Sequence, residues 1–261
     1  MAAIEVEHVD CVVSFLGDSD EPAANAYRVL NQGSEALILA IARKIDFPKL
    51  FPEALATTDN IDKASTLLKI GYRISEVSNL TVKRNRQPYQ ACRAGQIDML
   101  SFFHSHGFDF NSKDPYGWTP LMAAADGGNL AVVKMLLGFG VRIGDDDGTG
   151  ATALMYAAWS GRKDCIRELV KYGADINAVD EDGWTAMVGA LWFNDDESAA
   201  RVLFALGTQL DIQPNGRSSV TPARSIAQIA IASQDTADAR SKVGPLGDWF
   251  VFVVSGEVML V

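Results

Sequence analysis

The chain has 261 residues, of which 48% are hydrophobic and 21% charged, and its net charge is −10. This composition is typical of a globular protein with a sizeable core and argues against disorder over most of the length. The acidic balance argues against nucleic acid and anionic membranes as partners. It favours either a partner with a basic surface or solubility alone.

The three cysteines, Cys11, Cys92 and Cys165, are widely spaced and form no CxxC pair. This pattern indicates free thiols in a reducing compartment rather than a disulfide framework or a zinc site. The N-terminal residues are acidic and include no Lys or Arg, which is the wrong polarity for a secretory or transit peptide. Since no uncharged stretch reaches about 18 apolar residues, we expect a cytoplasmic protein that binds no membrane.

The N-terminal part of the chain has only weak helical patterns. Residues 1–33 are expected to be an extension that packs on the first helical unit. Residues 34–80 contain the apolar stretches EALILAIARKIDF, from Glu35, and ASTLLKIGYRI, from Ala64, and are interpreted as a degenerate helix pair with an insertion. Residues 81–113 are interpreted as a divergent helix pair, which contains ACRAGQIDMLSFFHSHGFDFN from Ala91.

The middle of the chain consists of three similar segments, residues 114–146, 147–179 and 180–216, of which the third carries extra residues. Four landmarks recur in one register, three of them within these segments and the fourth beginning in the segment before, which is the signature of a repeat architecture. The landmarks are spaced by 33 residues and are Asp114, Asp147 and Asp180, then Gly117, Gly150 and Gly183, then Thr119, Thr152 and Thr185, and finally Gly107, Gly140 and Gly173.

Each segment is predicted to form a turn, a short helix, a second helix and an extended finger. The D-x-x-G turn combines a short side chain that can bond the local backbone with a glycine that can adopt positive φ. The threonine that follows is placed to cap the first helix, whose first position suits Pro120. The second helix has an apolar stripe that includes Leu136 and Leu169, and Gly140 and Gly173 are expected to end it. One such unit cannot bury its own apolar face, so the units must stack.

These segments resemble ankyrin repeats, whose pattern is D-x-x-G-x-T-P-L-H-x-A-A-x-x-G followed by an apolar helix and G-A-D-x-N. The likeness is strongest in residues 147–180, which read DGTGATALMYAAWSG and then YGADIN, and it is clear over residues 91–212. The histidine of the family pattern is replaced by Met122, Met155 and Val188. The resemblance implies an all-α solenoid of helix-turn-helix units with short β-like fingers, plus non-repeat N- and C-terminal caps.

Two elements are expected after the repeats. Residues 217–243, opened by Thr221 and Pro222, are interpreted as a C-terminal capping half-repeat. Residues 244–261 form an apolar tail with two β-prone runs about a turn, which predicts a hairpin. Such a hairpin would either cover the last repeat or offer an edge to a partner.

Signatures of catalysis are missing, because the chain has no GxxxxGK[ST], HExxH or GxSxG motif and no dinucleotide-binding glycine loop. His104 and His106 are two residues apart, so on a helix they point different ways and cannot share a metal. His104 occupies the apolar position of Leu137 and is expected to be partly buried, and Cys165 is expected to lie in the core. We therefore expect a protein that is not an enzyme, with no catalytic, cofactor-binding or metal-binding residues.

In ankyrin proteins the concave face is formed by the finger tips and by outer positions of the first helices, and these positions are free of packing duties. The repeat register places aromatic and acidic side chains there. The predicted partner-binding residues are the aromatic Tyr116, Trp118, Tyr156, Trp159, Trp184 and Trp192 and the acidic Asp126, Asp145, Asp146, Glu181 and Asp182. For Trp192 and its neighbour Phe193, burial against another repeat is an equal alternative, and for Trp118, Trp159 and Trp184 it is the lesser one. For the acidic runs the alternative is a solvated finger tip, and a calcium site has the least support.

The sequence therefore predicts a non-enzymatic protein-protein interaction module with an aromatic and acidic concave face. The partner is expected to be another protein with a basic or mixed apolar and basic surface. One alternative is an immunity or inhibitor protein that masks a basic toxin or enzyme. Another is an enzymatic or ligand-binding activity in the unassigned N-terminal segment.

Overall fold

The computed structural model describes residues 34–44, 46, 48, 55, 58, 60–74, 87–193 and 198–208, together with the backbone of 251–254 and 257–260. The predicted N-terminal extension (1–33) and the predicted capping half-repeat (217–243) lie outside these residues, as does most of the predicted insertion. The chain divides into two compact units, the first ending at Asp114 and the second beginning at Pro115, except that Cys92–Gly95 belong to the second.

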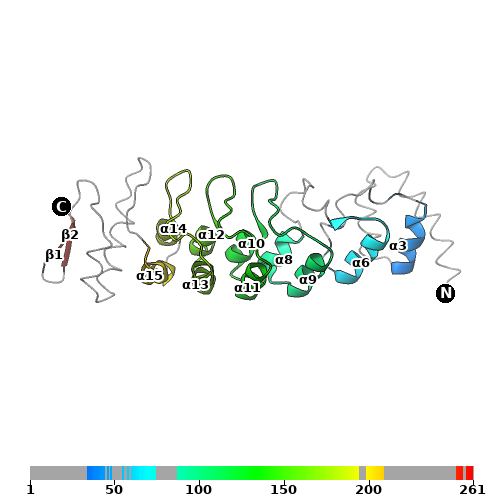
Figure 1. The fold of residues 1–261 in the computed structure, drawn as a ribbon, viewed down its shortest axis with the longest axis horizontal. Coiled ribbons are helices and arrows are strands. Elements are labelled where there is room, and N and C mark those ends of the chain that lie inside the picture. The colour runs from blue at the N-terminus through cyan, green and yellow to red at the C-terminus, as the bar shows by residue number, and fades with distance from the viewer. Residues whose placement is uncertain are drawn as a thin grey trace. The chain divides into compact units, whose positions relative to one another are not determined.

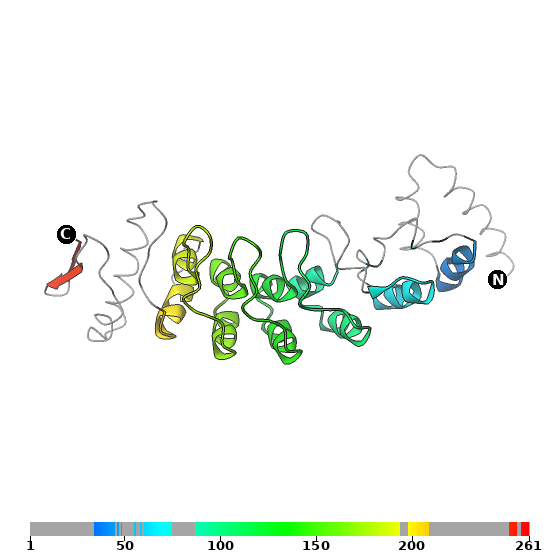
Figure 2. The same ribbon diagram turned by 45° about the horizontal axis from the view of Figure 1, so that its top comes forward.

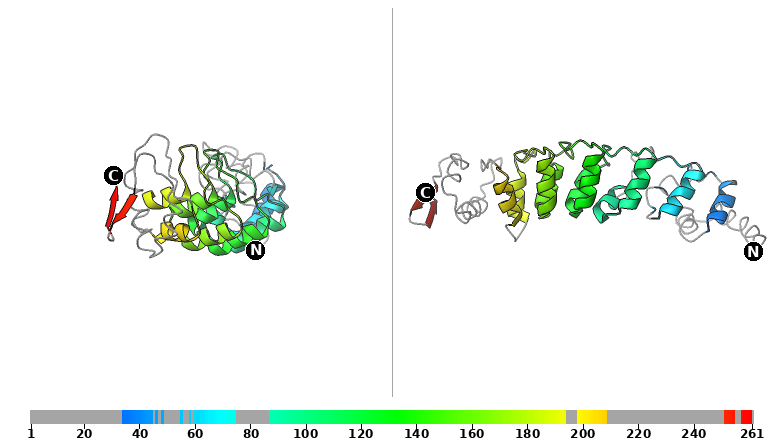
Figure 3. Two further views of the ribbon diagram at one scale, coloured as in Figure 1. Left: turned by 60° about the vertical axis from the view of Figure 1, so that its left-hand side comes forward. Right: turned by 60° about the horizontal axis from the view of Figure 1, so that its bottom comes forward.

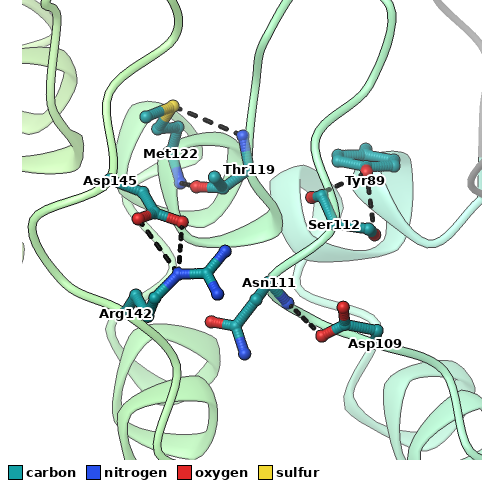
Figure 4. Close-up of polar contacts among 8 residues, drawn as sticks. All are labelled: Tyr89, Asp109, Asn111, Ser112, Thr119, Met122, Arg142 and Asp145. Atoms are coloured by element: carbon teal, nitrogen blue, oxygen red, sulfur yellow. Dashed lines mark hydrogen bonds and ion pairs between the residues drawn. The ribbon is translucent and has the colours of Figure 1, made fainter.

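The first unit contains helices α3 (Glu35–Ala42), α6 (Ile61–Lys69), the start of α8 (Tyr89–Ala94) and α9 (Ile97–Ser105). Helix α6 packs against both α3 and α9. Phenylalanines dominate the core beside α9, where the ring of Phe108 lies 5.8 Å from Phe103 and 5.0 Å from Phe110 between centroids. The Tyr89 hydroxyl donates to the Ser112 carbonyl at 3.0 Å (Figure 4).

The second unit contains three helix pairs in two layers. The pairs are α10 (Pro120–Gly127) with α11 (Leu130–Gly138), α12 (Ala153–Trp159) with α13 (Lys163–Lys171), and α14 (Ala186–Phe193) with α15 (Ser198–Ala205). Helices α10, α12 and α14 pack side by side in one row, and α11, α13 and α15 in the other (Figure 1). The fingers rise from the first row (Figure 2), and the helices lie nearly parallel in the right-hand view of Figure 3. The fold is the all-α repeat solenoid that the sequence predicts.

A threonine caps the first helix of each pair, as the 33-residue spacing predicts. The hydroxyl oxygens of Thr119, Thr152 and Thr185 accept from the backbone N–H three residues later, at 3.3, 3.5 and 3.3 Å. This bond satisfies one of the donors that a helix start leaves free. In α10 the sulfur of Met122 also accepts from the Thr119 N–H at 3.3 Å (Figure 4), so Met122 takes part in the cap where the family has histidine.

The second helices supply the apolar core. Leu136, Ile166 and Leu169 are completely buried, and Cys165 is buried with them, as predicted. The prediction for His104 is wrong, because its side chain is exposed. Its position lies at the edge of the apolar stripe, where an imidazole can remain in contact with water.

The finger turns of neighbouring repeats touch through glycine. Gly117 has φ +83° and Gly150 has φ +86°, in the left-handed region that favours glycine. A Cβ on Gly117 would overlap the backbone of Asp147, and one on Gly150 would lie 2.8 Å from the Asp180 Cα. In addition, the Glu181 N–H donates to the Thr149 carbonyl at 2.8 Å. Each turn is therefore held against the next.

Near the C-terminal end, β1 (Val251–Val254) pairs antiparallel with β2 (Glu257–Leu260). The register places Val251 opposite Leu260 and Val254 opposite Glu257, so the two strands form a hairpin where the sequence suggests one.

Replacing Gly117 by alanine should lower the free energy of unfolding more than replacing Gly140. Both glycines have positive φ, and that conformation alone costs alanine about 1–2 kcal/mol. Gly140 has no atom within 4 Å of the added Cβ, whereas Gly117 faces the Asp147 backbone. Urea unfolding of both variants measures the difference, and equal losses would show that the turns do not support one another.

Candidate functional site

We call the first helices and fingers of the second unit the inner layer (residues 115–127, 141–161 and 175–193) and the second helices the outer layer (residues 128–140, 162–174 and 198–208). Charge is unevenly divided between them. The inner layer carries one basic residue, Arg142, and eight acidic ones, namely Asp126, Asp145, Asp146, Asp147, Asp175, Asp180, Glu181 and Asp182. The outer layer carries two acidic residues, Asp164 and Glu168, and six basic ones, namely Lys134, Arg162, Lys163, Arg167, Lys171 and Arg201. The inner layer is thus negative and the outer layer positive.

Two of the inner-layer aspartates hold the turns together. One carboxylate oxygen of Asp147 accepts from the N–H of Thr149 at 2.9 Å, from its hydroxyl at 2.7 Å, and from the N–H of Ala151 at 3.2 Å. Asp180 accepts from the N–H groups of Asp182 at 3.0 Å and Trp184 at 2.7 Å. These bonds give both carboxylates a structural role in their turns.

The other Asp147 oxygen joins the turn to the aromatic side chains of the inner layer. It accepts from the Tyr156 hydroxyl at 2.6 Å. The Tyr156 ring lies 4.4 Å from that of Trp118 and 5.1 Å from that of Trp159. Burial and the bond to Asp147 raise the pKa of Tyr156 well above its usual range. Partial burial would raise the pKa of Asp147, but hydrogen bonds from Tyr156, Thr149 and Ala151 outweigh it and hold that pKa below its ordinary value.

Trp159 packs into a notch that Gly189 creates in the next repeat. A Cβ on Gly189 would overlap the indole ring of Trp159. The indole Nε1 is buried and has no hydrogen-bond partner in the described part of the chain. The sequence predicts an exposed Trp159, with burial against a neighbouring repeat as the lesser alternative, and the structure shows it half-buried. The reason is that glycine at this one position lets the neighbouring repeat accept the ring.

The third repeat presents its aromatic side chains to solvent. The side chains of Trp192 and Phe193 are 53% and 59% exposed, so another repeat does not bury most of their surface, although the Phe193 ring lies 5.9 Å from that of Trp159. Trp184 is half-buried, with its ring centroid 5.7 Å from that of Trp192 and 5.6 Å from that of Phe193. Trp118 and Tyr156 are half-buried, whereas Tyr116 is 56% exposed. The predicted aromatic residues therefore include both packing and exposed members.

Three of the predicted acidic residues form hydrogen bonds or ion pairs with other residues of the chain. Asp126 lies 3.0 Å from an Arg93 guanidinium nitrogen and accepts from the Ser160 hydroxyl at 2.6 Å. Both Asp145 oxygens accept from Arg142 Nε, at 3.1 and 3.0 Å (Figure 4). Asp146 accepts from the Gly148 N–H at 2.7 Å.

Glu181 and Asp182 differ from these three. Both side chains are exposed, and no basic side chain in the described ranges forms an ion pair with either. Of the five predicted acidic residues, these two are best placed to meet a partner.

The described residues hold little reactive chemistry. Burial raises the pKa of Cys165 to about 11 and that of Cys92 well above its usual range, so neither thiol is an activated nucleophile. Among the residues that the structure describes, no three His, Cys, Asp or Glu side chains are grouped to hold a metal ion. Within that same part of the chain, no helix is both long and apolar enough to span a bilayer.

The sequence places Phe193 on this surface beside Trp192 but does not include it among the predicted partner-binding residues. Sequence reasoning missed the role of a glycine. Gly189, at the register position of Tyr156, received no role, and the exchange of a large residue for glycine 33 residues later was the available signal.

Comparison with protein-family models identifies the family. The family model described as ankyrin repeats, in three copies, matches residues 54–147, 88–180 and 140–214. These overlapping matches extend from residue 54 to residue 214, well over half of the chain. No curated protein matches the chain significantly.

Replacing Tyr156 by phenylalanine should lower the free energy of unfolding at neutral pH by about 1–2 kcal/mol, because a half-buried hydrogen bond to a carboxylate is lost. Asp147 has a lowered pKa, so its stabilising effect is complete above its unfolded pKa of about 4 and is lost as pH falls through the folded value. The difference between the two proteins should therefore shrink in acid. Tyr172→Phe is the control, because no hydrogen bond of the Tyr172 hydroxyl is described. An equal loss of unfolding free energy in that variant would contradict the role of Asp147.

Replacing Gly189 by alanine should destabilise the protein, because the added methyl displaces Trp159 at an overpacking cost of about 1–3 kcal/mol. Gly138→Ala is the matched control, since it is also helical but has no atom within 4 Å of the new Cβ. It should leave stability unchanged or raise it. Urea unfolding measures the loss of stability, and a red shift of tryptophan fluorescence reports the displacement of Trp159. A stable Gly189→Ala variant with unshifted emission would rule out the notch.

Proposed function

Because the chain belongs to the ankyrin-repeat family, we propose that it is a non-enzymatic module that binds another protein on the inner layer of its second unit. The observation that carries this proposal is the coincidence of two exposed aromatic rings, Trp192 and Phe193, with a layer that has eight acidic residues and one basic residue. The partner surface that fits such a layer is basic, or mixed basic and apolar.

The aromatic residues supply the source of affinity. Trp192 and Phe193 expose more than half of their surface, although most large apolar side chains of the unit are buried. Aromatic residues are common interface anchors, and each contributes about 2 kcal/mol or more when it is fully enclosed at a hot spot. Burying these rings in a complex would recover hydrophobic free energy that the isolated chain does not gain.

Charge supplies selectivity and speed of association. A negative inner layer attracts a basic partner from a distance, and it repels nucleic acid and other acidic surfaces. Because Asp126, Asp145, Asp147 and Asp180 bond to groups within the chain, direct ion pairs with a partner fall mainly to exposed carboxylates such as Glu181 and Asp182.

Affinity capture with the full chain tests the proposal when two surface variants are compared. Trp192→Ala with Phe193→Ala removes exposed rings of the inner layer, and Tyr172→Ala removes a ring of the outer layer that is 50% exposed. A partner retained by the wild-type chain and by the Tyr172 variant should lose about tenfold or more in affinity for the inner-layer variant. Association should also slow as salt is raised. Equal retention by all three proteins would reject the inner layer as the binding surface.

A further inference from the structure

We infer that Trp184, Trp192 and Phe193, together with Glu181 and Asp182, form a subsite on the third repeat that takes an arginine side chain of the partner. This inference rests on the proposed function and specifies the chemistry of its partner. The five residues are referred to as the arginine subsite.

The three rings of the arginine subsite offer aromatic surface in more than one orientation. The plane of Trp184 makes an angle of 76° with that of Trp192 and 32° with that of Phe193. Trp184 is half-buried, whereas Trp192 is 53% exposed and Phe193 is 59% exposed. A flat group that stacks on the face of one ring can therefore also contact a second ring beside it.

The two carboxylates belong to residues of the turn that leads into Trp184. The Asp180 carboxylate accepts from the backbone N–H groups of both Asp182 and Trp184, and the Asp180 N–H donates to the Trp184 carbonyl at 3.0 Å. The Glu181 N–H is bonded to Thr149 of the preceding turn at 2.8 Å. Glu181, Asp182 and Trp184 thus belong to one braced turn, whose backbone needs no reordering when a partner binds.

Among the three repeats of the second unit, the 33-residue register shows this combination on the third alone. Trp184 corresponds to Ala151 of the second repeat and to Trp118 of the first, and Phe193 corresponds to Ser160 of the second. Trp192 corresponds to Trp159, whose ring is used for packing against Gly189.

The two acidic residues of the subsite are also absent from the equivalent positions of the other two repeats. Glu181 and Asp182 correspond to Gly148 and Thr149 in the second repeat and to Pro115 and Tyr116 in the first. The Phe193 ring also lies 5.9 Å from that of Trp159 in the preceding repeat. The second repeat stacks on its neighbours with Ser160 in place of Phe193 and without the two carboxylates, so the repeat fold itself does not require this set of residues.

The chemistry of the arginine subsite favours arginine over lysine. A guanidinium is planar and weakly hydrated, so it can stack on an aromatic face while its in-plane N–H groups donate to carboxylates. A lysine ammonium is compact and strongly hydrated, and it gains less from the rings. A purely apolar group would use the rings but would leave both carboxylates without a partner.

The test compares two peptides of equal length and charge, one alternating arginine with glycine and one alternating lysine with glycine. Binding to the full chain at physiological salt is measured by calorimetry and tryptophan fluorescence. We expect the arginine peptide to bind about three- to tenfold more tightly, the gain that stacking on partly exposed rings provides. Trp192→Ala with Phe193→Ala should abolish this preference, and Glu181→Gln with Asp182→Asn should weaken binding of both peptides.

Tyr172→Ala and Asp164→Asn, an aromatic and an acidic residue of the outer layer, are the matched controls and should change neither affinity. Circular dichroism and urea unfolding check that each variant is folded.

Equal affinity for the two peptides, or a preference that survives the loss of both rings, would overturn the arginine subsite. If both peptides bind equally and Glu181→Gln with Asp182→Asn abolishes that binding, the basic partner of the proposed function remains supported. Binding of neither peptide overturns the subsite, and the capture experiment then decides the proposed function by itself.

Discussion

Contact between neighbouring repeats is the interaction on which the second unit depends. Helix α12 packs on α10 and α14, and α13 packs on α11 and α15, so no pair of helices buries its apolar side chains without its neighbours. The complete burial of Leu136 and Leu169 in the outer layer follows from this stacking. Side chains that face away from the neighbours have no part in it. That division separates residues that maintain the fold from residues available for recognition.

Most of the fold could be predicted because its signals are local and repeated. The threonine caps, the glycines that end the helices and the buried leucines each obey a rule of backbone geometry or hydrophobic spacing that operates within one repeat. His104 shows the limit of such rules. The register assigns it an apolar position, but a position at the edge of a stripe leaves part of the side chain in water, and only the packed structure shows how much.

The candidate site was less predictable because the burial and bonding of its residues depend on contacts between neighbouring repeats. Trp159 and Trp192 occupy the same register position, yet the first fills the notch beside Gly189 and the second is exposed. The acidic residues divide in the same way, since Asp126 bonds to Arg93 and Ser160, whereas Glu181 and Asp182 are exposed. The repeat register places these groups on the inner layer, but their contacts across repeats decide whether they support the fold or remain available.

Rigidity links this division to binding. An exposed aromatic side chain on a mobile loop loses much of its affinity to the entropy of ordering that loop, whereas a ring on a braced turn or helix loses mainly side-chain freedom. Trp184 follows a turn tied by Asp180, and Trp192 and Phe193 end helix α14, whose start Thr185 caps. The bonds that order the repeat thus also order its exposed rings. Stacking leaves these positions free to vary in chemistry, and capping and turn bonds keep their backbone fixed, which is the combination that a recognition surface requires.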